Sequence, residues 1–232
     1  ARHEGRGVEP GASRGRIGGR PTSEEGERPA TAGAVAIGLN CYPASPRSLT
    51  IEQAREICRQ VSGSLQRVGV FVNHGEAEIR QHVETLMLDA VQLHGEEPAG
   101  LIRALHPIPV IRAFRCRDQG LSQVREALES FRQSESLPAA VLVDAHLPGQ
   151  YGGTGQVLDW QQLDPVAGRV DGCPLVLAGG LNAENVGSAI RQARPWAVDT
   201  ASGVESEPGR KDPELLARFV DQALSVFSEL EG

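Results

Sequence analysis

The chain has 232 residues and a formal net charge of −7, so bulk attraction to nucleic acid or to an anionic membrane is not expected. No apolar stretch is long enough to span a bilayer, and the first residues lack the apolar core of a signal peptide, which predicts a cytoplasmic protein. Lys211 is the only lysine among 23 lysine and arginine residues and lies in the polar turn "GRKDPE", which argues against Schiff-base chemistry.

The first fifteen residues, "ARHEGRGVEPGASRG", carry few apolar side chains and are predicted to be a disordered tail. Beyond them, short apolar runs alternate with helical patterns, starting with a weak strand candidate at Arg16–Gly19. Seven further strands are predicted at Val35–Leu39, Val68–Val72, Ala90–Leu93, Pro109–Ile111, Ala139–Val143, Pro174–Ala178 and Ala197–Val198. Helices are predicted at Ile51–Val61, Ala77–Leu86, Pro98–Leu105, Leu121–Phe131, Ala183–Gln192 and Pro213–Phe227.

This alternation predicts an α/β fold with a parallel sheet and right-handed crossover connections. Eight strand–helix units over residues 16–232 favour a single (β/α)8 barrel, also called a TIM barrel. A doubly wound open sheet is the alternative, but its G-x-G-x-x-G fingerprint is missing.

The four cysteines, Cys41, Cys58, Cys116 and Cys173, are scattered without any C-x-x-C pair. Reduced thiols explain them better than a disulfide framework does. No cluster of His, Asp, Glu and Cys has the spacing of a metal site, so no metal is expected.

Polar residues follow several predicted strands, at the end where a barrel of this kind carries its active site. Asp144 follows the sixth strand and is a candidate general acid or base, the alternative being an aspartate that caps a turn. Arg47, in the loop after the second strand, suits a bidentate pair with a substrate carboxylate, or else is a solvated surface residue. Gln92 and His94 flank the end of the fourth strand, where a structural histidine and a catalytic one are equally consistent with the pattern.

Glycine-containing loops follow the last two strands, which is where barrels of this kind commonly bind phosphate. In "LVLAGGLNAENV", the pair Gly179–Gly180 lies between an apolar strand and a helix for which Asn182 is the expected N-cap. Ser202 and Gly203 occupy the next such loop. Backbone N–H groups in both loops predict a site for a sugar phosphate, the alternative being a tight turn that needs positive φ.

Six motifs together resemble the phosphoribosylanthranilate isomerase family of tryptophan biosynthesis: "GLNCYPASPR", "VGVFVN", "DAVQLHGEE", "LVDAHLPGQYGGTGQVLDW", "LVLAGGLNAENV" and "VDTASGVESEPGRKDPELL". The resemblance implies a TIM barrel of the ribulose-phosphate-binding type, an isomerase that works without metal or cofactor. Its reaction would convert N-(5′-phosphoribosyl)anthranilate to 1-(2-carboxyphenylamino)-1-deoxyribulose 5-phosphate by an Amadori rearrangement. This small molecule is the expected partner, with no nucleic acid or membrane, and a monomer is expected.

By position, the resemblance makes Asp144 the general acid that opens the ribose ring and Arg47 the residue that holds the anthranilate carboxylate. It makes the loops at Gly179–Gly180 and Ser202–Gly203 the phosphate cradle. Gln92 and His94 are then expected at the substrate.

The first strand departs from this pattern. The family has a cysteine there, the general base that takes the C2′ proton, and an ungapped alignment puts Gly18 in its place. Cys41 is considered as a replacement base, although its position matches a family aromatic residue. The segment before Ala32 contains Pro29 and few apolar residues, so the first strand–helix unit is predicted to be atypical.

Three interpretations are left open by the residues. The first is an active isomerase with a reduced rate. The second is a catalytically impaired homologue that keeps the phosphate and carboxylate contacts but lacks the general base. The third is a related phosphate-binding barrel such as indole-glycerol-phosphate synthase, which the absence of a lysine at a strand end disfavours.

Overall fold

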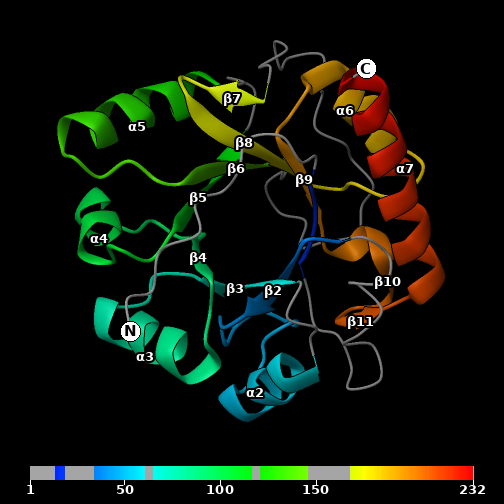
Figure 1. Ribbon diagram of the computed structural model, residues 1–232. Coiled ribbons are helices and arrows are strands. Elements are labelled where there is room, and N and C mark those ends of the chain that lie inside the picture. Colours follow the sequence, from blue (N-terminus) through cyan, green and yellow to red (C-terminus); the bar gives the residue numbers. More distant parts are fainter. Residues whose placement is uncertain (1–13, 19–33, 61–64, 117–120, 146–167, 232) are drawn as a thin grey trace, which may run out of the picture.

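The computed structural model describes residues 14–18, 34–60, 65–116, 121–145 and 168–231. Within these residues, eight parallel strands form a closed barrel, in which β6 pairs with β8 and β9 pairs with β1 (Figure 1). The barrel strands are β1 (Arg14–Gly18), β2 (Ala36–Asn40), β3 (Gln66–Phe71), β4 (Ala90–Leu93), β5 (Val110–Cys116), β6 (Ala140–Ala145), β8 (Cys173–Ala178) and β9 (Ala197–Thr200). The predicted (β/α)8 fold class is confirmed, and the open doubly wound sheet is wrong.

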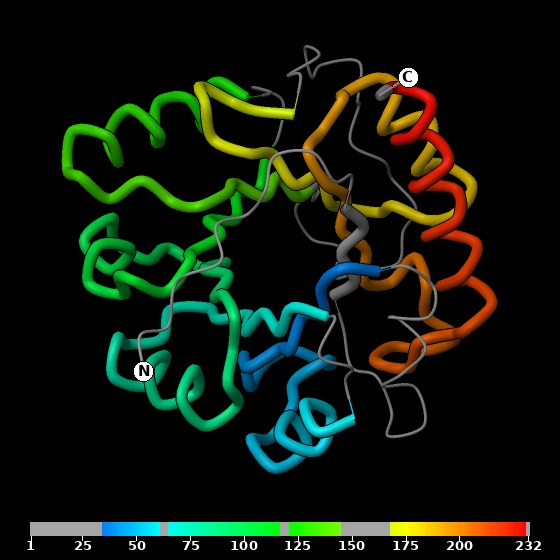
Figure 2. The backbone as a smooth tube through the Cα atoms, viewed as in Figure 1, coloured from blue at the N-terminus to red at the C-terminus, as the bar shows by residue number. Residues whose placement is uncertain are grey.

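Helices surround the barrel, and the chain advances round it in sequence order from β2 to the last helix (Figures 1 and 2). The described helices are α2 (Ile51–Gln60), α3 (Glu76–Leu86), α4 (Ala99–Ala104), α5 (Ser122–Gln133), α6 (Val186–Ala193) and α7 (Pro213–Glu231). Across the described ranges, no helix combines the length and apolar character that crossing a membrane requires.

The alternation of side chains along each strand builds two separate apolar regions. In β2, Ile37 and Leu39 join the large buried cluster that also contains the apolar faces of the helices. Ala36, on the opposite face of the strand, packs instead with Val68 and Ala90 from the next two strands. The apolar side chains of this second cluster are of small to medium size, as expected where neighbouring strands converge on a barrel axis.

Two element boundaries differ from the predictions in a way that the hydrogen bonds of the structure explain. The fifth strand was predicted to end at Ile111 but continues to Cys116, because its charged Arg112 and Arg115 interrupt the apolar run without interrupting the pairing with β6. Helix α6 begins at Val186 rather than at residue 183.

Asn182, the predicted N-cap of α6, caps a turn that precedes the helix. Its Oδ1 accepts hydrogen bonds from the backbone N–H groups of Glu184 and Asn185, both at 3.0 Å. The side chain of Asn185 in turn accepts from the N–H of Asn182 at 2.9 Å. This reciprocal pairing stabilises the turn, and the helix starts after it.

Strand β1 begins at Arg14, two residues before the predicted start, and pairs with β2 and β9. Its last residue, Gly18, lies opposite Gly38 of β2. The predicted disordered tail lies, apart from its last two residues, outside the described residues. The segment between β1 and residue 34, which was predicted to be atypical, also lies outside the described residues, and the single-domain assignment of residues 16–232 stays a prediction.

Two short antiparallel pairings extend the barrel where no strand was predicted. Strand β7 (Arg169–Val170) pairs with the start of β8. Beyond β9, a 3-10 turn at Ser202–Val204 leads into a hairpin of β10 (Glu205–Glu207) and β11 (Arg210–Lys211). This hairpin brings β11 back beside the loop that follows β9.

Candidate active site

The predicted site residues gather at one end of the barrel, because parallel strands present all their carboxyl ends together. Asp144, near the end of β6, lies opposite Ala178, the last residue of β8. Gly179 follows directly, so the candidate acid and the first glycine loop leave neighbouring strands at the same level. Gly18 ends β1 on the far side of β8 and β9 from Asp144.

Asp144, His94 and Gln92 form a short chain of side chains across β4 and β6. The Asp144 Oδ2 lies 3.6 Å from the His94 Nε2, and both side chains are partly exposed. The Gln92 Nε2 lies 3.0 Å from the His94 Nδ1. With the amide donating to Nδ1, a neutral His94 carries its proton on Nε2, the nitrogen that faces the carboxylate.

Gln92 is also the residue whose polar atoms point most clearly to a ligand. Its side chain is 3 % exposed, and its Oε1 has no hydrogen-bond partner among the described residues. A buried amide oxygen without a partner is costly unless another donor reaches it. A substrate hydroxyl beside His94 would supply such a donor.

A buried ion pair supports the loop that carries His94, and the sequence analysis did not single it out. The Glu97 carboxylate pairs with the Arg112 guanidinium and accepts hydrogen bonds from the N–H groups of Asn73 at 2.8 Å and Gly95 at 3.0 Å. Arg112 also donates to the Gly95 carbonyl at 2.9 Å. The second Glu of "HGEE" thereby fixes the backbone that follows His94.

The glycine pair after β8 has the conformation that its composition suggested. Gly179 has φ of 93° and Gly180 has φ of 63°, the left-handed region in which a Cβ is unfavourable. The Asn185 side chain donates to the Gly180 carbonyl at 3.0 Å and fixes the turn. The two glycines therefore do form a tight turn with positive φ. Phosphate binding by the same loop stays a prediction.

Gly203 brings the two glycine loops into direct contact. A Cβ at this position would lie 2.8 Å from both the carbonyl carbon of Leu181 and the Oγ1 of Thr200, and it would collide with the Leu181 carbonyl oxygen. That oxygen accepts a hydrogen bond from Thr200 Oγ1 at 2.6 Å. The absence of a side chain at Gly203 is what allows the loops after β8 and β9 to form one surface.

Arg47 lies at the same end of the barrel, but it already has a carboxylate partner in this structure. Its Nε lies 2.9 and 3.1 Å from the two carboxylate oxygens of Glu205, and its Nη2 lies 2.7 Å from Oε2. Burial alone would raise the pKa of Glu205, but the hydrogen bond from Arg47 and the charges of Lys211 and Arg47 outweigh it and lower that pKa. The sequence suggested a partner for Arg47 in the ligand and missed the one within the chain.

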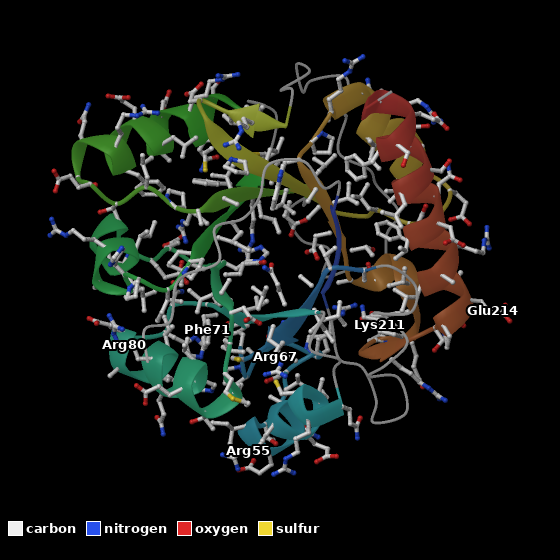
Figure 3. All side chains as sticks on the ribbon, in the orientation of Figure 1. Arg55, Arg67, Phe71, Arg80, Lys211 and Glu214 are labelled. Carbon is white, nitrogen blue, oxygen red and sulfur yellow. The ribbon has the colours of Figure 1, made fainter. Side chains whose placement is uncertain are left out.

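Lys211 is buried, although the sequence placed it in a polar turn. Its residue is 5 % exposed, and its Nζ donates to Glu205 Oε1 at 3.1 Å and to the carbonyl of Ala201 at 2.6 Å (Figure 3). Burial lowers the pKa of Lys211, and the charge and hydrogen bond of Glu205 oppose that shift. Lys211 is the only lysine in the chain, but the polar residues around it in the sequence give no indication that it is buried.

Cys41 does not fit the role of a replacement base. Its thiol is buried and donates to the Leu39 carbonyl at a distance of 3.6 Å. Burial, with smaller contributions from Cys58 and Glu78, raises its pKa to about 12. A thiol that stays protonated at neutral pH accepts no proton from a substrate.

Two further expectations concern parts of the molecule that the structure describes only partly. The glycine-rich loop that Asp144 opens lies outside the described residues from His146 onward. Among the described residues, no three His, Cys, Asp or Glu side chains are grouped as a metal site would require.

The barrel and its strand ends define an enzyme-type (β/α)8 protein in which a candidate acid lies beside paired glycine loops suited to phosphate. The model of the family N-(5′-phosphoribosyl)anthranilate (PRA) isomerase matches residues 24–222. The chain belongs to that family.

Individual relatives agree with this assignment. The N-(5′-phosphoribosyl)anthranilate isomerase of Acidithiobacillus ferrooxidans is 41% identical over 207 residues, which cover 88% of this chain and 94% of the relative. The relative from Pelobacter propionicus, with the same name, is 43% identical over 85% of this chain and 89% of its own length. Phosphoribosyl anthranilate isomerase from Thermotoga maritima superposes with a TM-score of 0.80 at 38% identity, over 92% of this chain and all of that one.

One solved structure of phosphoribosyl anthranilate isomerase holds reduced 1-(o-carboxyphenylamino)-1-deoxyribulose 5-phosphate and superposes on this chain with a TM-score of 0.77 at 35% identity, over 92% of this chain and all of that one. The family match begins at residue 24, so Gly18 lies outside it. The comparisons favour the isomerase over a catalytically impaired homologue.

Proposed function

We propose that the protein catalyses the Amadori rearrangement of N-(5′-phosphoribosyl)anthranilate to 1-(2-carboxyphenylamino)-1-deoxyribulose 5-phosphate, an isomerisation in tryptophan biosynthesis. The observation that carries the proposal is the position of Asp144, facing His94 and next to the Gly179–Gly180 loop, in a chain of the PRA isomerase family. The proposed acid and phosphate sites then lie on neighbouring strands, β6 and β8, and the proposed sugar contacts lie at the end of β4, which β5 separates from β6.

Asp144 acts as the general acid in the first step. Its carboxyl proton passes to the ribose ring oxygen, the bond from that oxygen to C1′ breaks, and the anthranilate nitrogen forms a double bond to C1′. Loss of the C2′ proton then gives an enolamine. When C1′ gains a proton and the C2′ hydroxyl loses one, the ketose product is complete, and no proton is gained or lost overall.

The remaining site residues bind the substrate. The loops at Gly179–Gly180 and Ser202–Gly203 hold the phosphate through backbone N–H groups, which the absence of side chains at the glycines leaves accessible. Arg47 holds the anthranilate carboxylate, while Gln92 and His94 contact the sugar hydroxyls. The unpartnered Oε1 of Gln92 supports this last assignment.

Gly18 lies where the family resemblance places the base that removes the C2′ proton. Glycine has no proton acceptor, so removal of that proton is the slow step in this chain. A missing general base typically lowers a rate by about 10² to 10⁴. The protein is therefore proposed to be an isomerase whose turnover is limited at the second step.

The product identifies the reaction. Purified chain is incubated with freshly formed N-(5′-phosphoribosyl)anthranilate, and the product is characterised by mass and by the NMR signal of its C2′ ketone. The proposal requires an isomer of unchanged mass with a ketone carbon, formed in excess over a no-protein control. Release of free anthranilate alone would contradict it.

We also propose that the protein is a monomer and that it works in the cytoplasm. Four large apolar side chains are exposed among the described residues, and each comes from a different segment of the chain: Tyr42, Met87, Leu137 and Leu230. One solved relative from Thermotoga maritima is described as dimeric, so light scattering after size-exclusion chromatography is the test. The four cysteines are free and buried, as reduced thiols are in a reducing compartment.

A further inference from the structure

Three charged side chains form one buried cluster beside the proposed site. Arg47 follows β2, Glu205 starts β10, and Lys211 ends β11, so the first two partners are 158 residues apart in the chain. The side chains of Glu205 and Lys211 are 4% and 5% exposed, and that of Arg47 is 19% exposed. Arg47 is therefore the member through which the cluster reaches solvent or a ligand.

Counting the groups in direct contact, the cluster has two cations and one anion, a formal net charge of +1. Glu205 occupies the Nε and Nη2 of Arg47. No hydrogen bond from its Nη1 to another described residue is present. The guanidinium is thus held on one edge, and its other edge can donate to a second carboxylate.

A purely structural ion pair between Arg47 and Glu205 would not require Lys211. A buried ammonium costs free energy, and a single carboxylate already neutralises a single guanidinium. With Lys211 present, the charge of Glu205 is shared between two cations, so the charge of Arg47 is not cancelled. Lys211 also donates to the carbonyl of Ala201, directly before Ser202, and so ties the cluster to the second glycine loop.

We propose that Glu205 and Lys211 are positioning residues for substrate recognition: Glu205 orients Arg47 toward the substrate carboxylate, and Lys211 offsets the charge of Glu205 so that Arg47 still attracts an anion. This inference rests on the proposed function, in which Arg47 binds the anthranilate carboxylate. It assigns roles to two residues that do not themselves touch the substrate.

The test compares two ligands that differ only in the group that Arg47 recognises. One is reduced 1-(o-carboxyphenylamino)-1-deoxyribulose 5-phosphate, and the other is its phenylamino counterpart without the carboxylate. Calorimetry gives the dissociation constant of each ligand, and the value for the ligand without the carboxylate is divided by the value for the ligand that has it. This ratio reports carboxylate recognition and is unaffected by a loss of affinity common to both ligands. Arg47→Met sets the ratio expected when recognition is absent.

Three variants separate charge from orientation. Lys211→Met removes the offsetting charge and is expected to lower the ratio about ten-fold, the size of one charge-assisted hydrogen bond. The double variant Lys211→Met/Glu205→Gln restores the net charge and keeps an acceptor for Arg47, so the ratio returns to within about three-fold of wild type. Lys211→Met/Glu205→Ala has the same charge but no acceptor, and its ratio stays low.

The matched control is Glu207→Gln, which removes an exposed carboxylate from the same strand and leaves the ratio unchanged. Equal weakening of both ligands in Lys211→Met would overturn the inference, because a structural brace acts on both alike. If Lys211→Met does not fold, the two double variants decide, and equal ratios in them would contradict the role of Glu205. A wild-type ratio near one would instead contradict the proposed function itself.

Discussion

Replacing Gly203 with alanine tests how the two glycine loops form one phosphate surface. The added Cβ would collide with the Leu181 carbonyl oxygen and would lie 2.8 Å from the carbonyl carbon. Restoring a carbon–carbon distance of about 3.5 Å already needs a shift of about 0.7 Å, and relieving the collision with the oxygen needs more, so the loops must separate by more than about 0.7 Å. The hydrogen bond from Thr200 Oγ1 to the Leu181 carbonyl would lengthen from 2.6 Å to beyond about 3.3 Å. Overpacking costs about 1–3 kcal/mol and a weakened hydrogen bond about 1 kcal/mol, which gives a destabilisation of about 2–4 kcal/mol.

The same separation moves the N–H groups of one loop relative to those of the other. Loss of one or two hydrogen bonds to a phosphate lowers affinity by about 10- to 100-fold. Urea unfolding measures the stability change, and calorimetry with the reduced product measures the affinity. Gly100→Ala is the matched control, because a Cβ there meets nothing within 4 Å and alanine favours a helix. A Gly203→Ala protein with wild-type stability and affinity would show that the two loops do not need the missing side chain at Gly203 in order to meet.

Three further predictions concern the chemistry at the strand ends. Asp144→Asn is expected to lower kcat by a factor of about 10² to 10⁴. The dissociation constant of the reduced product is expected to change less than about three-fold. A variant that keeps its turnover would show that Asp144 is not the general acid. Gly18→Cys raises kcat by at least about ten-fold, measured with wild type in parallel; no gain in a folded variant shows that β1 does not present this position to the substrate. The Cys41 thiol, whose pKa is about 12, resists iodoacetamide at pH 8 in the folded protein, and rapid alkylation there contradicts its burial.

The barrel was predictable from the sequence because most strands contain an apolar run and the helices between them repeat apolar residues at helical spacing. Ala90–Leu93 matches its predicted boundaries, and β2 shifts by only one residue. The long fifth strand was cut short because Arg112 faces Glu97, a partner fifteen residues away that no local pattern reveals. Local sequence patterns predict helices and strands well. They fail where a charged side chain is paired with a residue far away in the sequence.

The same limit applies to the site. Asp144, His94 and the glycine loops could be named as candidates because they lie at the ends of strands that must meet. Arg47 could be named as a candidate as well, but its pairing with Glu205 depends on two loops that only the closed barrel brings together. Lys211 was assigned to a polar turn for the same reason. Lys211 can be buried because its ammonium group is paired with Glu205, and nothing in "GRKDPE" indicates that partner.

The decrease in substrate fluorescence measures whether this chain rearranges N-(5′-phosphoribosyl)anthranilate. Freshly formed substrate is added to purified protein, and the rate is compared with the spontaneous loss. We expect an added rate that is proportional to protein concentration and saturates with substrate. Loss at the spontaneous rate, in a protein that still binds the reduced product saturably, would contradict it.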